Sequence, residues 1–326
     1  MKHITILATT GSNLGSMDNP RRAFLAVNEF LKTKKKAPLF KVEVAGSSRE
    51  IRSDNGVYTI HADIEIRNLK KTDLIIIPAF EGDIQKNIEH NKDLIPWIIQ
   101  QYRKGAEVAS LCVGAFLLAY TGLLNGKSCS THWRAGNEFK KAFPDVNLVT
   151  EKIITDECGI YTSGGAFSAA NLILYIIGKY AGKEAAINCS KTFQVDIGRH
   201  SQSPFTIFKG QKDHNDRQII KAQEFIEKNI QEKITVNQLA AMLALGRRNL
   251  ERRFKKATSN SVIEYMQRVR MEVAKMRFET SAENVNEVMY NVGYNDPKAF
   301  RTTFKRITGL SPVQYRSKYN RDMITA

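Results

Sequence analysis

The feature that most constrains the fold of this 326-residue chain is an internal repeat in its last third. The segment 236–239 recurs as 285–288, and the blocks that follow it recur with an offset of 50 instead of 49, so one residue is added between them. Such a repeat predicts one small structural unit built twice, with the extra residue in a turn. The recurring pairs are Leu250 and Phe300, Phe254 and Phe304, Lys255 and Lys305, Thr258 and Thr308, Ser261 and Ser311, and Tyr265 and Tyr315.

Each copy has the hydrophobic spacing of two helices around a tight turn. The first copy predicts helices at 236–243 and 247–256, and the second predicts helices at 285–292 and 298–306. Two helices joined in this way form a helix-turn-helix motif, so the C-terminal third is predicted to be all-α with two such motifs. A helix at 262–278, roughly 25 Å long at ~1.5 Å per residue, connects the copies and would set their second helices about one DNA turn, or 34 Å, apart.

The second helix of each copy has one apolar face, formed by Leu250 and Phe254 or by Phe300 and Phe304, and its other faces are largely cationic. A single basic helix face is usually solvated surface, but two copies with the same bias are typical of helices that enter the major groove of DNA. The candidate DNA-binding residues are Arg247, Arg248, Asn249, Arg252 and Arg253 in the first copy, and Lys298, Arg301, Thr302, Lys305 and Arg306 in the second.

The net charge agrees with an anionic partner. The chain carries a formal charge of +16, and residues 211–326 alone hold 22 basic and 13 acidic side chains, a net charge of +9. Double-stranded DNA and an anionic membrane surface would both suit this excess. Because no apolar run approaches the ~18 residues of a membrane span and the first residues lack a signal-peptide pattern, we expect a cytoplasmic protein without a membrane partner.

The N-terminal part alternates short β-branched runs with helical patterns, which is typical of an α/β doubly wound, flavodoxin-like domain with a parallel sheet. A hairpin turn is expected at 54–57. Strands are predicted at 4–7, 40–44, 74–77 and 108–112, and helices at 21–32, 94–104 and 113–120.

Periodicity is lost between 193 and 216, where Gly, Pro, Ser and charged residues gather. We therefore predict an N-terminal domain at 1–192, a linker at 193–216 and a DNA-binding domain at 217–320. The four cysteines, at spacings of 17, 29 and 31, match no metal motif and no dense disulfide framework. No metal and no cofactor are expected.

Cys112 lies where a predicted strand gives way to a helix, in Ser110-Leu111-Cys112-Val113-Gly114. An elbow of this kind exposes a side chain to the positive end of a helix dipole, which favours a thiolate. A cysteine at a strand end is, however, more often a small buried hydrophobic residue. A redox role would need a partner cysteine, and the sequence places none beside it.

The C-terminal third resembles the DNA-binding domain of AraC/XylS-type transcription regulators. In the second copy the residues that carry this resemblance are Gly-Tyr at 293–294, Gly-Leu-Ser-Pro at 309–312 and Tyr-Arg at 315–316. The first copy departs from the family pattern, with Gly-Arg-Arg at 246–248 in place of Ser-x-Arg and Ser-Asn-Ser-Val at 259–262 in place of Gly-x-Ser-Pro. The resemblance implies sequence-specific binding of promoter DNA.

The N-terminal part resembles the PfpI-like branch of the class I glutamine amidotransferase-like fold, in the form that precedes AraC-type domains in GlxA-like regulators. The matching segments are IIIPAFEGD at 75–83, LCVGAFLLAYTGLLNGKSCSTHW at 111–133 and YTSGGAFSAANLIL at 161–174. This resemblance places Cys112 at the family nucleophile position. Val113 follows it where enzymes of the superfamily commonly have His, so the catalytic set looks incomplete and a non-enzyme is expected.

We therefore predict a transcription regulator whose N-terminal domain binds a small-molecule effector and forms a homodimer. The alternative is a PfpI-like hydrolase or amidase that uses Cys112 and carries a DNA-binding appendage; a third possibility is a nucleoid-type binder without a ligand. The elbow would supply backbone N–H groups and an apolar wall for a small polar metabolite. The candidate ligand-binding residues are Phe80, Cys112, Val113, His132, Gly165 and Phe167.

Overall fold

A computed structural model of the chain describes residues 1–52, 57–212 and 214–320. The chain divides into two compact units, Met1–Gln202 and Ser203–Ala326. The turn expected at 54–57 lies outside the described residues at its first three positions. The strands on either side of it, Glu50–Arg52 (β3) and Thr59–His61 (β4), pair antiparallel.

The first unit is built on one seven-stranded sheet, in the order β10-β11-β7-β6-β1-β2-β5. All neighbours in this sheet are parallel except β10 and β11, which run antiparallel. The predicted doubly wound α/β fold is confirmed. Its strands are β1 (Lys2–Ala8), β2 (Phe40–Gly46), β5 (Ile64–Glu65), β6 (Leu74–Ile77), β7 (Glu107–Ser110), β10 (Ile154–Glu157) and β11 (Ile160–Ser163), and β8 (Ser128–Cys129) pairs with β9 (Asn147–Leu148) outside it.

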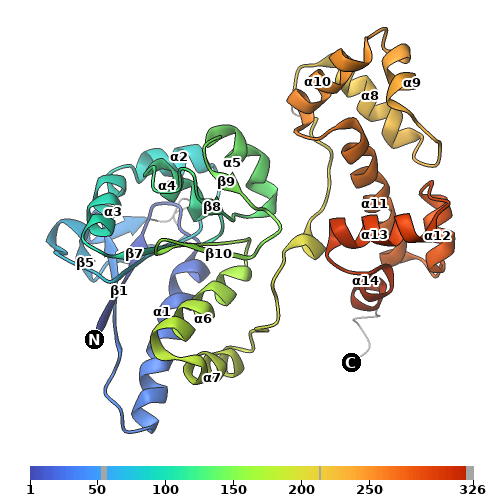
Figure 1. Ribbon diagram of the computed structural model, residues 1–326. Coiled ribbons are helices and arrows are strands. Elements are labelled where there is room, and N and C mark those ends of the chain that lie inside the picture. Colours follow the sequence, from blue (N-terminus) through green and yellow to red (C-terminus); the bar gives the residue numbers. More distant parts are fainter. Residues whose placement is uncertain (53–56, 213, 321–326) are drawn as a thin grey trace. The chain divides into compact units, whose positions relative to one another are not determined.

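Helices cover both faces of the sheet (Figure 1). Ile4 and Ile6 of β1 pack on one side in a core shared with α1, α6 and α7, whereas Leu7 points to a second core shared with α3, α4 and α5. This alternation is what a strand buried on both faces requires. The helices are α1 (Leu14–Thr33), α2 (Ile84–His90), α3 (Leu94–Arg103), α4 (Ala115–Tyr120), α5 (Gly136–Ala142), α6 (Ser168–Ala181) and α7 (Lys183–Phe193).

The helix α1 begins at Leu14, seven residues before the helix predicted at 21–32. Asn13 caps it, because its Oδ1 accepts a hydrogen bond from the N–H of Ser16 at 3.0 Å. Pro20 lies inside the helix. The Gly, Ser, Asn and Pro residues of its first two turns are more typical of a loop than of a helix, so the helical pattern starts later in the sequence. The error matters for function, since these two turns border the cavity described below.

The second unit is all-α, as predicted. Val262–Thr280 (α11) runs through it and separates two hydrophobic cores, one around Phe254 and Tyr265 and one around Phe300 and Phe304. Its other helices are α8 (Arg217–Lys228), α9 (Val236–Met242), α10 (Arg247–Thr258), α12 (Val285–Asn291), α13 (Pro297–Thr308) and α14 (Pro312–Tyr319).

The repeat is visible in how the helices begin. Ser261 and Ser311, 50 residues apart, each form a capping box at the start of α11 and α14. Thr235 and Asn284, 49 residues apart, do the same for α9 and α12. The offset changes inside the turn that precedes α13, so the extra residue of the second copy lies there and leaves both helix pairs intact.

The departure of the first copy from the Gly-x-Ser-Pro pattern leaves its turn geometry intact. Ser259 ends α10 with a φ of 58°, and Gly309 ends α13 with a φ of 76°. Both residues adopt the left-handed conformation, which a residue other than glycine takes only at some cost. The side-chain amide of Asn260 donates to the Thr258 carbonyl oxygen at 2.7 Å and holds this turn.

The segment 193–216 is shared between the two units. Its first part packs on the first unit, where the side-chain amide of Asn171 donates to the Asp196 carbonyl oxygen at 2.6 Å. Its later part packs on the second unit, where the Phe208 ring lies edge-on against Tyr265 with centroids 5.2 Å apart. The change from one unit to the other falls at the peptide between Gln202 and Ser203.

Candidate functional site

The elbow after β7 is shaped by its backbone. Cys112 has a φ of 55°, in the left-handed region, and starts a short 3₁₀ turn that leads into α4. Its N–H donates to Ser163 Oγ at 3.2 Å, and Thr131 Oγ1 donates to its carbonyl oxygen at 2.9 Å. Gly114 follows because the Pro78 carbonyl oxygen leaves no room for a Cβ there. The predicted strand to Cys112 therefore ends two residues early, at Ser110.

Cys112 is 8% exposed. Burial raises its pKa, although the backbone N–H groups of Ala166 and Val113 act in the opposite direction. The helix start alone therefore does not produce a thiolate, since the cost of desolvating the anion is larger. At neutral pH this sulfur is a weakly polar, uncharged group on a cavity wall.

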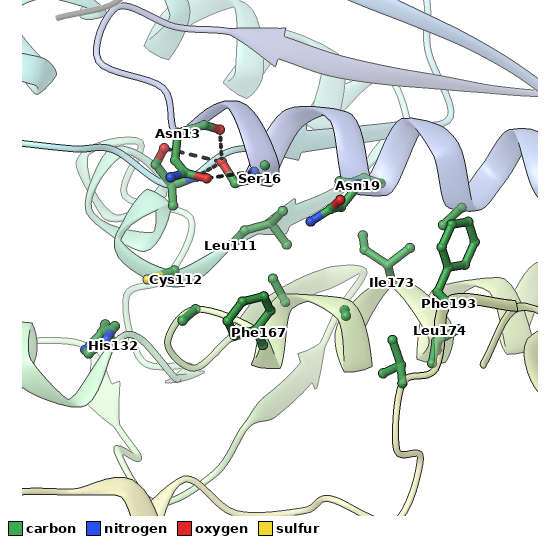
Figure 2. A pocket seen from close by; sticks show the side chains of 18 of the residues that line it. Asn13, Ser16, Asn19, Leu111, Cys112, His132, Phe167, Ile173, Leu174 and Phe193 are labelled. Atoms are coloured by element: carbon green, nitrogen blue, oxygen red, sulfur yellow. Dashed lines mark hydrogen bonds between the residues drawn. The ribbon is translucent and has the colours of Figure 1, made fainter. Parts of the chain in front are cut away.

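His132 follows β8 and faces the same cavity as Cys112 (Figure 2). Its Nδ1 accepts a hydrogen bond from the N–H of Arg134 at 3.1 Å, which places the proton of the neutral ring on Nε2. Burial, and after it the charge of Arg134, lower the pKa of His132. Within the described part of the chain, no hydrogen bond joins this imidazole to the Cys112 thiol.

A cavity of about 670 Å³ opens at this elbow, between the start of α1 and the start of α6. The ring of Phe167, 82% exposed, stands at its side. The cavity continues away from the elbow along α6 to the end of α7. Of the described residues, its lining comprises Asn13, Gly15, Ser16, Asn19, Pro20, Ala23, Ala79, Phe80, Leu111, Cys112, His132, Ala166, Phe167, Ala169, Ala170, Ile173, Leu174, Phe193 and Val195.

Four of the six predicted pocket residues line this cavity: Phe80, Cys112, His132 and Phe167. Val113 and Gly165 are absent from its lining. Gly165 instead lies against the His132 ring, which leaves no room for a Cβ, and its N–H donates to Gln202 Oε1 at 3.2 Å. The contribution of α1, α6 and α7 to the lining is not predictable from local patterns, because helices that far apart in the chain meet only in the fold.

The predicted basic helices are α10 and α13, each of which follows a short helix and a tight turn. Leu250 and Phe254 of α10, and Phe300 and Phe304 of α13, are buried as expected. In the described part of the chain, five exposed candidate residues enter no ion pair and no side-chain hydrogen bond. They are Arg248 on α10, and Lys298, Arg301, Thr302 and Lys305 on α13.

The other candidate residues have partners within the unit. Arg247 Nε pairs with Glu251 at 3.1 Å, Arg252 donates to Asn249 Oδ1 at 3.1 Å, and Arg306 donates to Gln267 at 2.7 Å. These partners are surface groups from which an arginine can turn to a phosphate at little cost.

Arg253 differs from the others because its guanidinium is held on several sides. It binds Asp216 through Nε at 2.9 Å and Nη2 at 2.6 Å, and its Nη1 donates to Gln218 at 2.6 Å. Asp216 is also the N-cap of α8, where it accepts from the Ile219 N–H. Arg253 thus fastens α10 to the start of α8, and its bidentate donor pair faces the protein.

Two family comparisons place these features among known proteins. Residues 29–179 match the DJ-1/PfpI family, and residues 239–318 match a helix-turn-helix domain. The HTH-type transcriptional regulator GbdR of Pseudomonas aeruginosa is 26% identical over 82% of this chain and 72% of its own. The HTH-type transcriptional regulator GlxA of Rhizobium meliloti is 23% identical over 66% of this chain and 67% of its own.

Solved structures agree on the fold of the first unit. A putative transcriptional regulator from Vibrio parahaemolyticus superposes with a TM-score of 0.52 at 22% identity, over 59% of this chain and 98% of that protein. An AraC family transcriptional regulator from Pseudomonas putida superposes with a TM-score of 0.50 at 16% identity, over 59% of this chain and all of that protein.

The fold and the doubled motif define a DNA-binding transcription regulator with an α/β N-terminal domain. More specifically, the chain combines a DJ-1/PfpI domain with an AraC-type helix-turn-helix domain. None of the described helices is long and apolar enough to cross a membrane. Among the described residues, no three His, Cys, Asp or Glu side chains are grouped to hold a metal ion.

Proposed function

We propose that a small molecule binds in the elbow cavity and thereby controls how the second unit binds promoter DNA. The observation that carries this proposal is the position of Gln202, the last residue of the first unit. Its side chain is hydrogen-bonded to the Gly165 N–H and to the Thr131 carbonyl oxygen, each next to a residue that lines the cavity. A ligand that shifts either loop therefore acts directly on the residue from which the DNA-binding unit continues.

The DNA contacts in this proposal come from residues 217–320, through one helix of each motif. Arg248 and Arg301 are exposed and unengaged, so they can donate to guanine or phosphate oxygens without first breaking an ion pair. Arg253 would stabilise the domain through Asp216 and make no DNA contact. Further contacts to the DNA backbone and bases would come from Arg247, Asn249, Arg252, Lys298, Thr302, Lys305 and Arg306. The connecting helix α11 has 19 residues, about 28 Å at ~1.5 Å each, which is close to the length that two adjacent major-groove sites require.

In this proposal the cavity binds its ligand without converting it. The protein is cytoplasmic and acts as a homodimer. Two features favour binding over chemistry. The Cys112 thiol has a raised pKa, and the neutral His132 is turned to Arg134 through Nδ1. A nucleophilic thiol needs a base within hydrogen-bond reach. The alternative of a PfpI-like hydrolase or amidase predicts turnover that Cys112→Ala abolishes.

The test of this proposal is protection of the DNA upstream of the gene by the full-length protein, measured over a range of salt concentrations and with cell metabolite fractions added. Binding should weaken steeply with salt, because cationic helices release counterions from DNA. A metabolite fraction should change the affinity of the full-length protein and leave that of residues 203–326 unchanged. Failure to protect any promoter sequence would contradict the DNA-binding part, and an equal response of both proteins would contradict control by the cavity.

A further inference from the structure

The elbow cavity has two chemically different ends (Figure 2). At the elbow it presents polar atoms of Cys112 and His132, and Asn19 of α1 lies farther from the elbow, between Leu111 and Ile173 in the view of Figure 2. Apart from Asn19, the lining beyond Leu111 is hydrocarbon, from Ala23 of α1 through α6 to the end of α7. We name this second part the apolar arm, and it is lined by Ala23, Ala170, Ile173, Leu174, Phe193 and Val195.

The apolar arm is lined by both small and large apolar side chains, and the small ones leave space beside the large ones. Ile173 and Leu174 are 3% and 5% exposed and belong to the core under α1. Ala23 and Ala170 stand where a longer side chain would fill the space between α1 and α6. An apolar cavity of this kind binds hydrocarbon in preference to water, because water in it finds too few hydrogen-bond partners.

The polar end carries no charge. None of the described residues that line the cavity is Asp, Glu, Lys or Arg. Its two titratable groups are both neutral at pH 7, because burial raises the pKa of the Cys112 thiol and lowers the pKa of His132. A carboxylate or ammonium group buried here would lose its hydration and would meet no Lys, Arg, Asp or Glu among the described lining residues, which is unfavourable.

The free hydrogen-bonding groups at this end suit a carbonyl or hydroxyl oxygen. Asn13 and Ser16 are already engaged, since Ser16 Oγ donates to the Asn13 carbonyl oxygen at 2.7 Å and accepts from the Ala79 N–H at 3.0 Å. His132 keeps its Nε2–H as a donor because Nδ1 is occupied by the Arg134 N–H. Farther along α1, the exposed amide of Asn19 offers a donor and an acceptor.

We propose that the cavity takes an uncharged amphiphile, with one carbonyl- or hydroxyl-bearing head between Cys112 and His132 and a hydrocarbon tail in the apolar arm. This inference rests on the proposed function and narrows its ligand from a small polar metabolite to a neutral molecule with a tail. The volume of about 670 Å³ is in the range of pockets that enclose a whole small ligand.

The test is calorimetric titration of the full-length protein with butanamide, hexanamide and octanamide, and with hexanoate and hexylammonium as charged molecules of matched length. Each added methylene of the amides should raise the affinity about fourfold, the value for transfer of one CH₂ group out of water. Hexanoate and hexylammonium should bind at least tenfold more weakly than hexanamide. An affinity that ignores chain length, or that is highest for a charged molecule, overturns the proposal.

Two alanine-to-leucine substitutions, one in the apolar arm and one outside the cavity as a control, test where the hydrocarbon tail binds. Ala170→Leu fills the apolar arm and should abolish the dependence on chain length while butanamide still binds. Ala142→Leu makes the same change at an exposed position of α5 outside the cavity, and should leave all affinities unchanged. Thermal unfolding checks that both variants fold. If Ala170→Leu changes the oligomeric state and the amides show no length dependence, a second copy of the chain occupies the arm and the proposal is wrong.

Failure of this inference can be told apart from failure of the proposed function. If the amides bind as expected but a saturating concentration leaves the DNA affinity of the full-length protein unchanged, the ligand class stands and control of DNA binding is contradicted. If the DNA affinity responds to charged metabolites and the amides do not bind, control stands and the neutral amphiphile is contradicted.

Discussion

Gln202 accepts a hydrogen bond from the Gly165 N–H through Oε1 at 3.2 Å, while its Nε2 donates to the carbonyl oxygens of Thr131 at 2.9 Å and Thr150 at 2.5 Å. The residue is 1% exposed and ends the first unit. The first residues of the second unit are hydrogen-bonded within that unit. Tyr319 donates to the Pro204 carbonyl oxygen at 3.1 Å, and Lys275 donates to the Thr206 carbonyl oxygen at 2.5 Å. The chain is therefore hydrogen-bonded within each unit close to the peptide between Gln202 and Ser203.

Replacing Gln202 by Ala should uncouple the two units. Loss of these hydrogen bonds leaves buried backbone groups unpaired, so we expect a loss of about 1–3 kcal/mol in the free energy of unfolding. DNA affinity without ligand should be retained, and its response to an active metabolite fraction should be lost. Chemical unfolding measures the change in stability, and DNA-binding titrations with and without the metabolite fraction measure the affinity and its response.

Gln101→Ala is the matched control for that variant. Gln101 is also buried in the first unit and donates to the backbone carbonyl oxygen of Leu69 at 3.3 Å, but it lies on α3, outside the cavity lining. It should lower stability without changing the response. Equal loss of the response in both variants would show that general destabilisation, not the Gln202 contacts, is responsible.

Arg248→Ala and Arg301→Ala should weaken DNA binding and leave the fold intact. Both side chains are exposed, so thermal unfolding should be unchanged. An arginine that reads a base is expected to contribute about 1–3 kcal/mol to specific affinity, and one that binds a phosphate to lower the salt slope by about 1 when removed. Titrations with the upstream DNA at several salt concentrations distinguish the two roles. Unchanged affinity in both variants would exclude α10 and α13 as the binding helices.

Arg253→Ala should instead lower thermal stability, because Asp216 then loses its bidentate partner at the start of α8. The Arg253 guanidinium holds the pKa of the Asp216 carboxyl below its usual value. A lowered carboxyl pKa stabilises the fold above the unfolded pKa of about 4, and this contribution disappears as the pH falls through the folded value. Unfolding measured between pH 7 and pH 2 should therefore show a smaller acid dependence for the variant. An identical pH profile would contradict the role of this ion pair.

Cys112 should react slowly with iodoacetamide. Because burial raises the pKa of its thiol, the thiolate becomes abundant only at a higher pH than for an ordinary cysteine, so its labelling rate should still rise above pH 9. Cys158 is exposed and should be labelled first, which makes it the internal control. Mass spectrometry of the labelled peptides at pH 7, at pH 9 and at a pH above 9 measures the labelling rates of both cysteines. Faster labelling of Cys112 at pH 7 would favour the hydrolase alternative.

Gly293→Ala should disrupt the second motif. Gly293 has a φ of 75°, and a Cβ there would lie 2.6 Å from the Ile230 carbonyl oxygen, so we expect a loss of about 1–3 kcal/mol in stability together with weaker DNA binding. Gly246→Ala is the matched control, because Gly246 has a φ of −67° and open space around its Cα. Its free energy of unfolding should change by less than about 1 kcal/mol. Equal effects of the two substitutions would argue against a special turn geometry at Gly293.

The sequence predicted those features that depend on residues near one another in the chain. The doubled motif follows from the spacing of Leu250, Phe254, Phe300 and Phe304, since helix periodicity is local and brings residues four apart onto one face. The helix starts repeat for the same reason, because a cap such as Ser311 bonds to a residue only three positions away. The elbow at Cys112 is predictable because the change from strand to helix takes place within a few residues.

Only the tertiary structure decided which of these residues meet distant partners. The apolar arm joins Ala23 to Leu174, and the Arg253 guanidinium binds Asp216, 37 residues earlier in the chain. Gln202 contacts Thr131 across 71 residues. No local pattern encodes such pairs, since they depend on how whole helices and strands pack once the chain has folded. The sequence by itself thus determined a DNA-binding regulator with two helix-turn-helix motifs, and the packing of α1, α6 and α7 decided the shape of its cavity and the uncharged character of its lining.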